Sequence, residues 1–523
     1  MKKIVRNILA ILAVVTVSAC NKLDLNVNPV QPVTVPPKQR LPAIQANLAY
    51  SLYSQARFGA YHSYYFTTRT GNSNAITDTW NYNSITRMGA WRWHYFDVGS
   101  NINQMVKRAA DESSNNYVGV GKIIMALSYL SATDVFGDMP FKEAYIGSFN
   151  PVYDPQEQIF AGVENLLNEG ITALDNVSPL AETMDAKSDL IYNGDLNKWK
   201  ALAKGVKARL KLRTANFKNG NQELLTIVND ALTNFNDAVF KYPEVSTTGW
   251  THNLWGPSDP PPAGEAFQFA DIRSDLVNTL PTDFLMRALT VDDGTTPAGS
   301  PVVYDPRLLK LTTPGKNNKY LGAKMSEGLR DVNLPTGTTF DDFAKLHGGY
   351  WTKDGSPYPV MIKEELLFIK AETQFHLNDL TGALASYKEG IRANMERLGV
   401  TEGQILNYLG DQRKVAQSEA ELDLSKIMMQ KYIALYLQGE TWSDMKRYGY
   451  KPSVYKNDLN GVTYAIYYPR YALAEWAGKY VQRFPYDPQT EYVYNPKEIE
   501  RLGAKARDWA FKPVWWVQNS TLK

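Results

Sequence analysis

The residues that could do chemistry in this chain are five histidines, one cysteine and three pairs of identical adjacent acids. The histidines are His62, His94, His252, His347 and His376, and no two of them have a metal-ligand spacing such as H-E-x-x-H. The only cysteine is Cys20, and the chain has neither a G-x-S-x-G motif nor a P-loop. We therefore predict no catalytic residue, no metal site and no resident cofactor.

The paired acids need a separate argument, because glycosidases work with two carboxylates. The pairs are Asp292-Asp293, Asp341-Asp342 and Glu364-Glu365. Two acids that are adjacent in the chain need not have their carboxylates at the distance that a glycosidase requires. Acidic residues are also common in turns and at the starts of helices for structural reasons. We expect solvated, structural roles and keep a glycosidase only as an alternative. Asn72 to Asp78 could offer oxygen ligands to calcium, but the loop lacks EF-hand spacing, so calcium stays an open possibility.

Aromatic residues point to a different chemistry, which is sugar binding. They make up 12% of the chain, with 32 Tyr and 12 Trp. Aromatic faces stack on the apolar faces of sugar rings, and neighbouring polar groups bind the hydroxyls; such sites are usually built on loops held by a rigid support. Three loop stretches have this composition, and the predicted ligand-binding residues are Trp80, Tyr82, Asn83, Trp250, Trp255, Tyr350 and Trp351.

Polar neighbours accompany each stretch: Asn74, Asp78 and Asn81 in the first, His252 and Asn253 in the second, and Asp354 in the third. The alternative for each Trp is a buried residue that fixes a long loop to the core, because Trp is usually largely buried. We expect packing roles for Trp91 and Trp93, and core positions for Trp199, Trp442, Trp515 and Trp516.

The N-terminus predicts export and lipidation. Lys2, Lys3 and Arg6 precede an apolar run that is too short to span a bilayer, and Val-Ser-Ala then leads to Cys20. This pattern resembles a bacterial lipoprotein signal, so we predict a signal peptide over residues 1–19 and acylation of Cys20. Several acyl chains make a stable anchor, and we expect contact with the membrane through that anchor only. Residues 20–40 are rich in Pro and Asn and are predicted to be a tether.

The elements that must hold the aromatic loops are helical. Val360 to Leu398 predicts two helices joined by HLNDL, with Asp379 as the N-cap of the second. This hairpin resembles a tetratricopeptide unit, which must stack on similar units to bury its apolar faces. We predict a mainly all-α domain over residues 41–523. This domain has two helical blocks, at about 41–235 and 360–448, and the second block ends in one helix from Ser425 to Tyr448. A loop-rich insertion at 241–358 separates the blocks, and an irregular segment at 451–523 follows them.

Net charge excludes one class of partner. The formal charge of the chain is +2, and removal of residues 1–19 leaves 53 basic against 54 acidic residues (56 minus Lys2, Lys3 and Arg6). Because nucleic-acid binding needs a basic surface, we predict no nucleic-acid partner.

Several segments, in this order, resemble one family, the SusD/RagB outer-membrane lipoproteins of Bacteroidetes-type bacteria. They are LDLNVNP from Leu23, TDVFGDMPFKEA from Thr133, GDLNKWKALAKGVKARLKLR from Gly194, DPRLLKL from Asp305, ELLFIKAETQFHLNDLTGA from Glu365, GETWSDMKRYG from Gly439 and RFPYDPQTEYVYNP from Arg483. No single motif is decisive, but their order covers nearly the whole chain.

The resemblance implies a SusD-like fold in which four tetratricopeptide-like hairpins support a loop-rich face. It implies a non-catalytic lipoprotein on the outer face of the outer membrane that captures a nutrient, most often an oligosaccharide. It also implies a partner, a SusC-type TonB-dependent transporter. The alternatives are a peptide-capturing member of the same family and a structural, protein-binding repeat lipoprotein.

Overall fold

The computed structural model describes residues 35–70, 76–85, 87–242, 253–256, 276–291, 303–459 and 462–523. The predicted signal peptide and Cys20 lie outside these residues. The tether prediction extends too far, because the first helix, α2, already begins at Pro37. Proline is favoured in the first turn of a helix, where its missing N–H is not needed. Pro37 therefore starts the folded body and does not belong to the linker.

The described chain is mainly helical, which confirms the predicted fold class. The longer helices are α2 (Pro37–His62), α5 (Asn101–Asp111), α6 (Asn115–Phe136), α7 (Gln156–Asp175), α8 (Leu196–Thr214), α9 (Asn221–Thr233), α13 (Lys363–His376), α14 (Leu380–Arg397), α15 (Glu402–Leu409), α16 (Leu424–Ala434) and α17 (Gly439–Arg447). The shorter ones are α3 (Ile76–Thr79), α4 (Gly89–Arg92), η3 (Trp93–Ser100), α11 (Asp283–Leu289), α12 (Leu308–Leu311), α18 (Glu491–Tyr494), α19 (Pro496–Leu502) and α20 (Trp515–Asn519).

Strands are short and occur in antiparallel pairs. The pairs are β1 (Phe66–Thr68) with β3 (Thr279–Pro281), β2 (Ala238–Phe240) with β6 (Tyr358–Met361), β4 (Thr290–Val291) with β5 (Val303–Tyr304), and β7 (Lys456–Leu459) with β8 (Val462–Ala465). Single 3-10 turns are η2 (Tyr82–Ser84), η5 (Lys316–Asn318), η6 (Gly328–Arg330), η7 (Phe340–Asp342), η8 (Glu419–Glu421), η9 (Ala474–Trp476) and η10 (Trp509–Phe511). The loop-rich insertion and the C-terminal segment thus contain short elements of their own.

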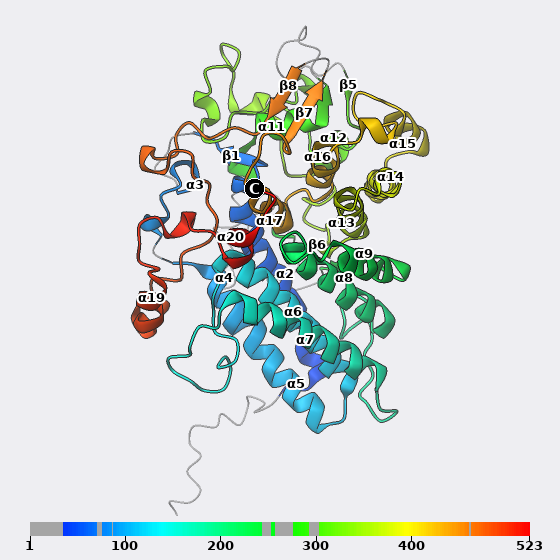
Figure 1. Cartoon of the computed structure of the whole chain (residues 1–523), viewed down its shortest axis with the longest axis vertical. Coiled ribbons are helices and arrows are strands. Elements are labelled where there is room, and N and C mark those ends of the chain that lie inside the picture. The colour runs from blue at the N-terminus through cyan, green and yellow to red at the C-terminus, as the bar shows by residue number, and fades with distance from the viewer. Residues whose placement is uncertain are drawn as a thin grey trace, which may run out of the picture.

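The predicted hairpin at 360–398 is confirmed as α13 and α14. The side chain of Asp379 accepts a hydrogen bond from the backbone N–H of Gly382 at 2.9 Å, which satisfies one of the free donors at the start of α14. Phe368, Tyr387 and Ile391 are fully buried between the two helices and their neighbours. Helices α6, α7, α8, α9, α13 and α14 pack one against the next and form a curved stack along one side of the molecule (Figure 1).

The single helix predicted over Ser425 to Tyr448 is wrong, because the structure has two helices, α16 and α17. Leu437 between them has a φ of +59°, which no α-helix accommodates. The hydroxyl of Tyr65 lies 2.7 Å from the carbonyl oxygen of Tyr432 and 3.0 Å from that of Leu435, so a side chain binds carbonyls at the end of α16. The break lets α16 pack on α13 while α17 packs on α2.

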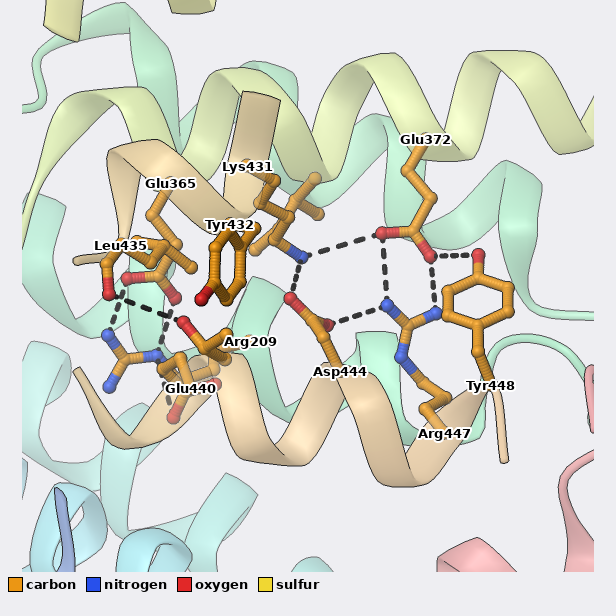
Figure 2. A network of polar contacts seen from close by, with 12 residues as sticks. Arg209, Glu365, Glu372, Lys431, Tyr432, Leu435, Glu440, Asp444, Arg447 and Tyr448 are labelled. Carbon is orange, nitrogen blue, oxygen red and sulfur yellow. Dashed lines mark hydrogen bonds and ion pairs between the residues drawn. The ribbon is translucent and has the colours of Figure 1, made fainter. Parts of the chain in front are cut away.

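A buried network of charges joins these helices at the centre of the molecule (Figure 2). Glu372 of α13 accepts hydrogen bonds from both terminal nitrogens of Arg447 and from the hydroxyl of Tyr448 at 2.6 Å. Lys431 of α16 lies 3.4 Å from Glu372 and 2.8 Å from Asp444. Asp444 also pairs with Arg447 at 2.7 Å. Two acidic and two basic side chains are therefore paired with one another inside the protein. Buried charges require such pairing, because no solvent stabilises them.

A second part of the network reaches α8 and α6. Arg209 binds Glu365 of α13 through two nitrogens, at 2.7 and 2.6 Å, and lies 3.5 Å from Glu440 of α17. One turn further along α8, Arg213 pairs with Asp134 of α6 at 2.9 Å and with Glu440. These pairs fix the helical stack to the C-terminal helices and so hold the loops that the stack supports.

Helix α6 is the one helix in the described part of the chain that is long and apolar enough to cross a membrane by length and composition. Because 89% of that apolar stretch is buried inside the protein, α6 is better explained as the central core helix. It ends where Gly137 adopts a φ of +84°, a conformation that side chains with a Cβ rarely adopt.

Candidate functional site

Three of the predicted stacking residues are buried, which corrects the expectation that they project from loops. Trp80, Trp255 and Trp351 are only 1%, 2% and 2% exposed. Trp80 packs edge-on against Tyr468, with ring centroids 5.4 Å apart, and Trp255 packs in the same way on Tyr53 at 4.5 Å. Their faces are covered by protein, so in this structure they fix loops to the core and cannot stack on a ligand.

The second and third predicted stretches are brought together, but as a framework. The side-chain amide of Asn253 donates to the carbonyl oxygens of Trp351 at 3.1 Å and Ser356 at 2.9 Å, and its backbone N–H donates to the carbonyl of Asp354 at 2.7 Å. Tyr350 is half-buried and packs edge-on against Trp351, with ring centroids 4.8 Å apart. Trp250, His252 and Asn74 lie outside the described residues.

The remaining predicted tryptophans are packing residues, as expected. Trp199, Trp442 and Trp516 are at most 1% exposed, and Trp91 and Trp93 are buried as well. Trp515 was also expected in the core, but it is only half-buried and packs edge-on against Phe160 and Phe217 at the edge of the core.

Two predicted residues of the first stretch, Tyr82 and Asn83, line a surface hollow. Both belong to η2 and face the C-terminal segment of the chain. The ring of Tyr82 is 4% exposed, and its hydroxyl is hydrogen-bonded to His62. The exposed side chain of Asn83 donates to the carbonyl oxygen of Arg507 at 3.1 Å. These contacts fix the η2 turn against the segment that completes the hollow.

The hollow, which we call the aromatic pocket, has a volume of about 190 Å³. Its other lining residues are Ile85, Pro485, Pro488, Tyr492, Ala504, Lys505, Ala506, Arg507, Trp509 and Ala510. Ile85 directly follows η2, and the others come from α18, from η10 and from the chain on either side of α19, which lies on the same side of the molecule as α3 in Figure 1. Aromatic rings and prolines with a polar rim are the composition expected of a sugar-binding surface.

Tyr492 is the aromatic side chain in this pocket that combines accessibility with a fixed position. It is half-buried, and its hydroxyl donates to the carbonyl oxygen of Ala504 at 3.1 Å. Burial raises the pKa of Tyr492, so its hydroxyl stays protonated at neutral pH. The Nζ atom of Lys505 lies 5.9 Å from the centre of its ring. The ring is therefore held in place, while part of its surface remains open to a ligand.

The charges at the rim of the aromatic pocket are balanced. Arg507 pairs with Glu475 at 2.8 Å, and Lys505 lies 3.8 Å from Glu500. Trp509 forms part of the wall, and the guanidinium of Arg483 lies 4.4 Å from the centre of its ring. With its cations paired and with aromatic and proline side chains in its wall, the pocket suits a neutral, ring-shaped ligand.

A larger hollow lies on the outer surface of α7, α8 and α9, with a volume of about 610 Å³. It contains three lysines and three aspartates, and these pair with one another: Lys200 with Asp175 at 2.8 Å, and Lys204 with Asp230 at 2.9 Å, for example. No aromatic side chain lines it. Size alone favours this hollow, but the aromatic pocket has the chemistry that sugar rings require.

The acid pairs take structural roles wherever the structure describes them. Glu364 and Glu365 are at most 1% exposed, so the prediction that they are solvated is wrong. Glu364 pairs with Arg397 at 2.7 Å, which explains how a carboxylate is tolerated there. Asp342 accepts from the backbone N–H of Thr339 and caps η7, whereas Asp292 and Asp293 lie outside the described residues. Within the described ranges, no group of three or more His, Cys, Asp or Glu side chains could hold a metal ion.

Sequence reasoning missed Tyr492, Trp509, Pro485 and Pro488. The segment RFPYDPQTEYVYNP contains three of them, and it was recognised for its resemblance to a family and not as a binding surface. Its density of Tyr and Pro was the available signal. The fact that it faces Tyr82 and Asn83, some 400 residues earlier in the chain, could not be read from the sequence.

Comparisons with known proteins agree on one family. A sequence model of the SusD-like family, described as starch-binding and associating with the outer membrane, matches residues 29–469. A search of curated proteins finds no match.

Among solved structures, a chitin-binding SusD homologue from Flavobacterium johnsoniae is 18% identical, with a TM-score of 0.68, and the match covers 92% of this chain and 98% of that one. A SusD homologue from Parabacteroides distasonis is 21% identical, with a TM-score of 0.65 and the same coverages. A further chitin-binding protein is 21% identical, with a TM-score of 0.64, 92% of this chain and 99% of that one being covered.

Proposed function

Because the chain belongs to the SusD-like family of starch-binding proteins that associate with the outer membrane, we propose that it is a non-catalytic glycan-binding lipoprotein of that membrane. The observation that carries the proposal is the aromatic pocket, where Tyr492 and Trp509 meet the predicted residues Tyr82 and Asn83. Two structural relatives of this chain are described as chitin-binding, which supports a glycan as the ligand class.

The pocket suggests how the ligand is held. Its volume of about 190 Å³ is below the roughly 300–1,000 Å³ of pockets that enclose a drug-sized ligand. It therefore receives one ring or one end of an oligosaccharide, and the rest of the chain stays in solvent. In this proposal Tyr492 stacks on the apolar face of the sugar ring, while the exposed polar groups of Asn83 and Lys505 reach its hydroxyls.

Acylation of Cys20 would anchor the protein. Residues 21–34 lie between Cys20 and the first described residue, and an extended chain of 14 residues reaches about 46–50 Å. The folded body would thus remain close to the membrane without entering it. A SusC-type TonB-dependent transporter is the partner to which captured glycan would pass.

The first experiment compares ligand classes. The purified protein is run through native gels that contain starch, chitin derivatives or no polysaccharide, and release of reducing ends is measured in parallel. We expect retardation by at least one polysaccharide and no reducing ends. Release of reducing ends would overturn the non-catalytic assignment, and binding of peptides without any glycan would place the chain among peptide-capturing members.

Co-purification of a TonB-dependent barrel from outer membranes tests the partner, and its absence under mild detergent would count against that part of the proposal.

A further inference from the structure

A small basic pocket lies far from the aromatic pocket in the fold, between the start of α16 and strand β7. Figure 1 shows α16 and the β7–β8 hairpin beside each other at the end of the molecule opposite α5. The cavity has a volume of about 50 Å³, and about 10–15 Å³ of such space is enough to hold one water molecule. It is too small for a sugar ring but large enough for a group of a few atoms.

Lys414 contributes a buried ammonium to this basic pocket. The residue is 9% exposed, and its Nζ atom donates to the carbonyl oxygen of Thr290 at 2.6 Å. An ammonium has three N–H donors, and no second acceptor for this one is found among the residues that the structure describes. Burial lowers the pKa of Lys414 to about 8, so the group is mostly charged at neutral pH. Among the described residues, two N–H donors of this ammonium are therefore left without a hydrogen-bond acceptor.

The charges of the described residues around the basic pocket do not cancel. Its lining contains four cations, Arg413, Lys414, Lys426 and Lys456, against two carboxylates, Asp423 and Asp458. Asp411, outside the lining, pairs with Arg413 at 2.6 Å, and counting it still leaves four positive charges against three negative ones.

The two carboxylates of the lining are already engaged. Asp423 caps α16 by accepting from the backbone N–H of Lys426 at 2.9 Å and from the hydroxyl of Ser425 at 2.7 Å. Asp458 is hydrogen-bonded to Lys456 and Thr463. Among the described residues, neither Lys414 nor Lys426 has a carboxylate within ion-pair distance.

A polar side chain in the same lining provides independent support. The Nδ2 atom of Asn457 is inaccessible to solvent and has no hydrogen-bond partner among the described residues. A buried donor without an acceptor is destabilising. A ligand rich in acceptor oxygens would satisfy both this amide and the ammonium of Lys414.

We propose that the basic pocket binds a small oxyanion: a sulfate, phosphate or carboxylate group. Its oxygens would accept from Lys414, Lys426 and the Asn457 amide, and charge-assisted hydrogen bonds of this kind are about twice as strong as neutral ones. The group arrives either as a free ion or as a substituent of a larger ligand, and the second arm of the test below separates the two. The inference does not depend on the aromatic pocket, since the two share no lining residue.

The test uses isothermal titration calorimetry of the full chain with sodium sulfate, at constant ionic strength set with sodium chloride. We expect saturable binding of sulfate over chloride. Lys426→Ala should weaken it at least about fivefold, which is about 1 kcal/mol, whereas Lys497→Ala, at an exposed lysine of α19, should change it less than about twofold. Lys414→Met should abolish sulfate binding. If the Lys414→Met variant does not fold, the result for Lys426→Ala decides the test.

A second arm separates the sources of the oxyanion. A sulfated disaccharide is titrated alongside the unsulfated one. Sulfate-dependent binding of the disaccharide without binding of free sulfate identifies a ligand substituent, while equal binding of free sulfate and sulfated sugar identifies a free ion. If neither sulfate nor the sulfated sugar binds, or if Lys426→Ala binds like the wild type, the cavity holds only water and the proposal is overturned.

Discussion

Replacement of Glu372 by Gln should destabilise the protein strongly while changing its shape very little. Glu372 is fully buried and faces Arg447, Lys431 and the hydroxyl of Tyr448. The variant keeps the size of the side chain but removes its charge. Two buried cations, Arg447 and Lys431, are then left with one carboxylate, Asp444.

The magnitude follows from the cost of an uncompensated buried charge, which is about 3–5 kcal/mol. Unfolding entropies average about 2.1 cal/mol/K per residue, so the unfolding entropy of a folded body of about 490 residues is about 1 kcal/mol/K. Glu372→Gln should therefore lower the melting temperature by about 3–5 °C. Thermal melting followed by circular dichroism measures this shift.

Charge balance provides an internal control. Lys431→Met alone leaves two acids facing one cation, and it should also destabilise the protein. The double variant Glu372→Gln/Lys431→Met restores one acid against one base, so its loss should be smaller than the sum of the two single losses by at least about 1 kcal/mol. Glu389→Gln, whose side chain is 53% exposed, should cost less than about 0.5 kcal/mol. Additive losses, or a Glu372→Gln variant as stable as the wild type, would refute the reasoning.

Two further predictions concern acid stability and helix capping. Burial alone would raise the pKa of Glu440, but the guanidinium groups of Arg209 and Arg213 outweigh it and lower the pKa to about 2. Its contribution, on the order of 3 kcal/mol, is therefore present above about pH 4.5 and lost as the pH falls towards 2. The stability gap between wild type and Glu440→Gln in urea should close over that range, and a constant gap would contradict the assignment. Asp379→Ala removes the cap on Gly382 and should cost about 1 kcal/mol in the same assay; no change in the urea midpoint would show that the cap contributes nothing.

Local patterns in the sequence predicted much of the helical frame. The hairpin of α13 and α14 was predicted with its Asp379 cap, because periodicity and capping are properties of neighbouring residues. The break between α16 and α17 was missed, because it depends on Tyr65, which lies more than 360 residues earlier. Local sequence composition cannot show that the hydroxyl of Tyr65 binds carbonyl oxygens at the end of α16.

The candidate site was predicted only in part, for a related reason. Trp80 and Trp351 have the composition of stacking residues, yet their loops fold back and bury them. Composition shows which side chains can stack, but solvent access depends on what packs over them. Tyr82 and Asn83 do line a surface hollow, and their role in ligand binding stays a prediction, while Tyr492 is brought beside them by the tertiary fold.

The most direct test of glycan binding at the aromatic pocket compares two tyrosines of α18. Tyr492 lines the pocket, whereas Tyr494, two residues later, is 66% exposed and lies outside its lining. Calorimetry with an oligosaccharide of the polysaccharide that binds should show at least about tenfold weaker binding for Tyr492→Ala, a loss of about 1.4 kcal/mol. Tyr494→Ala should bind like the wild type. Unchanged affinity in a folded Tyr492→Ala variant would contradict the assignment of glycan binding to this pocket.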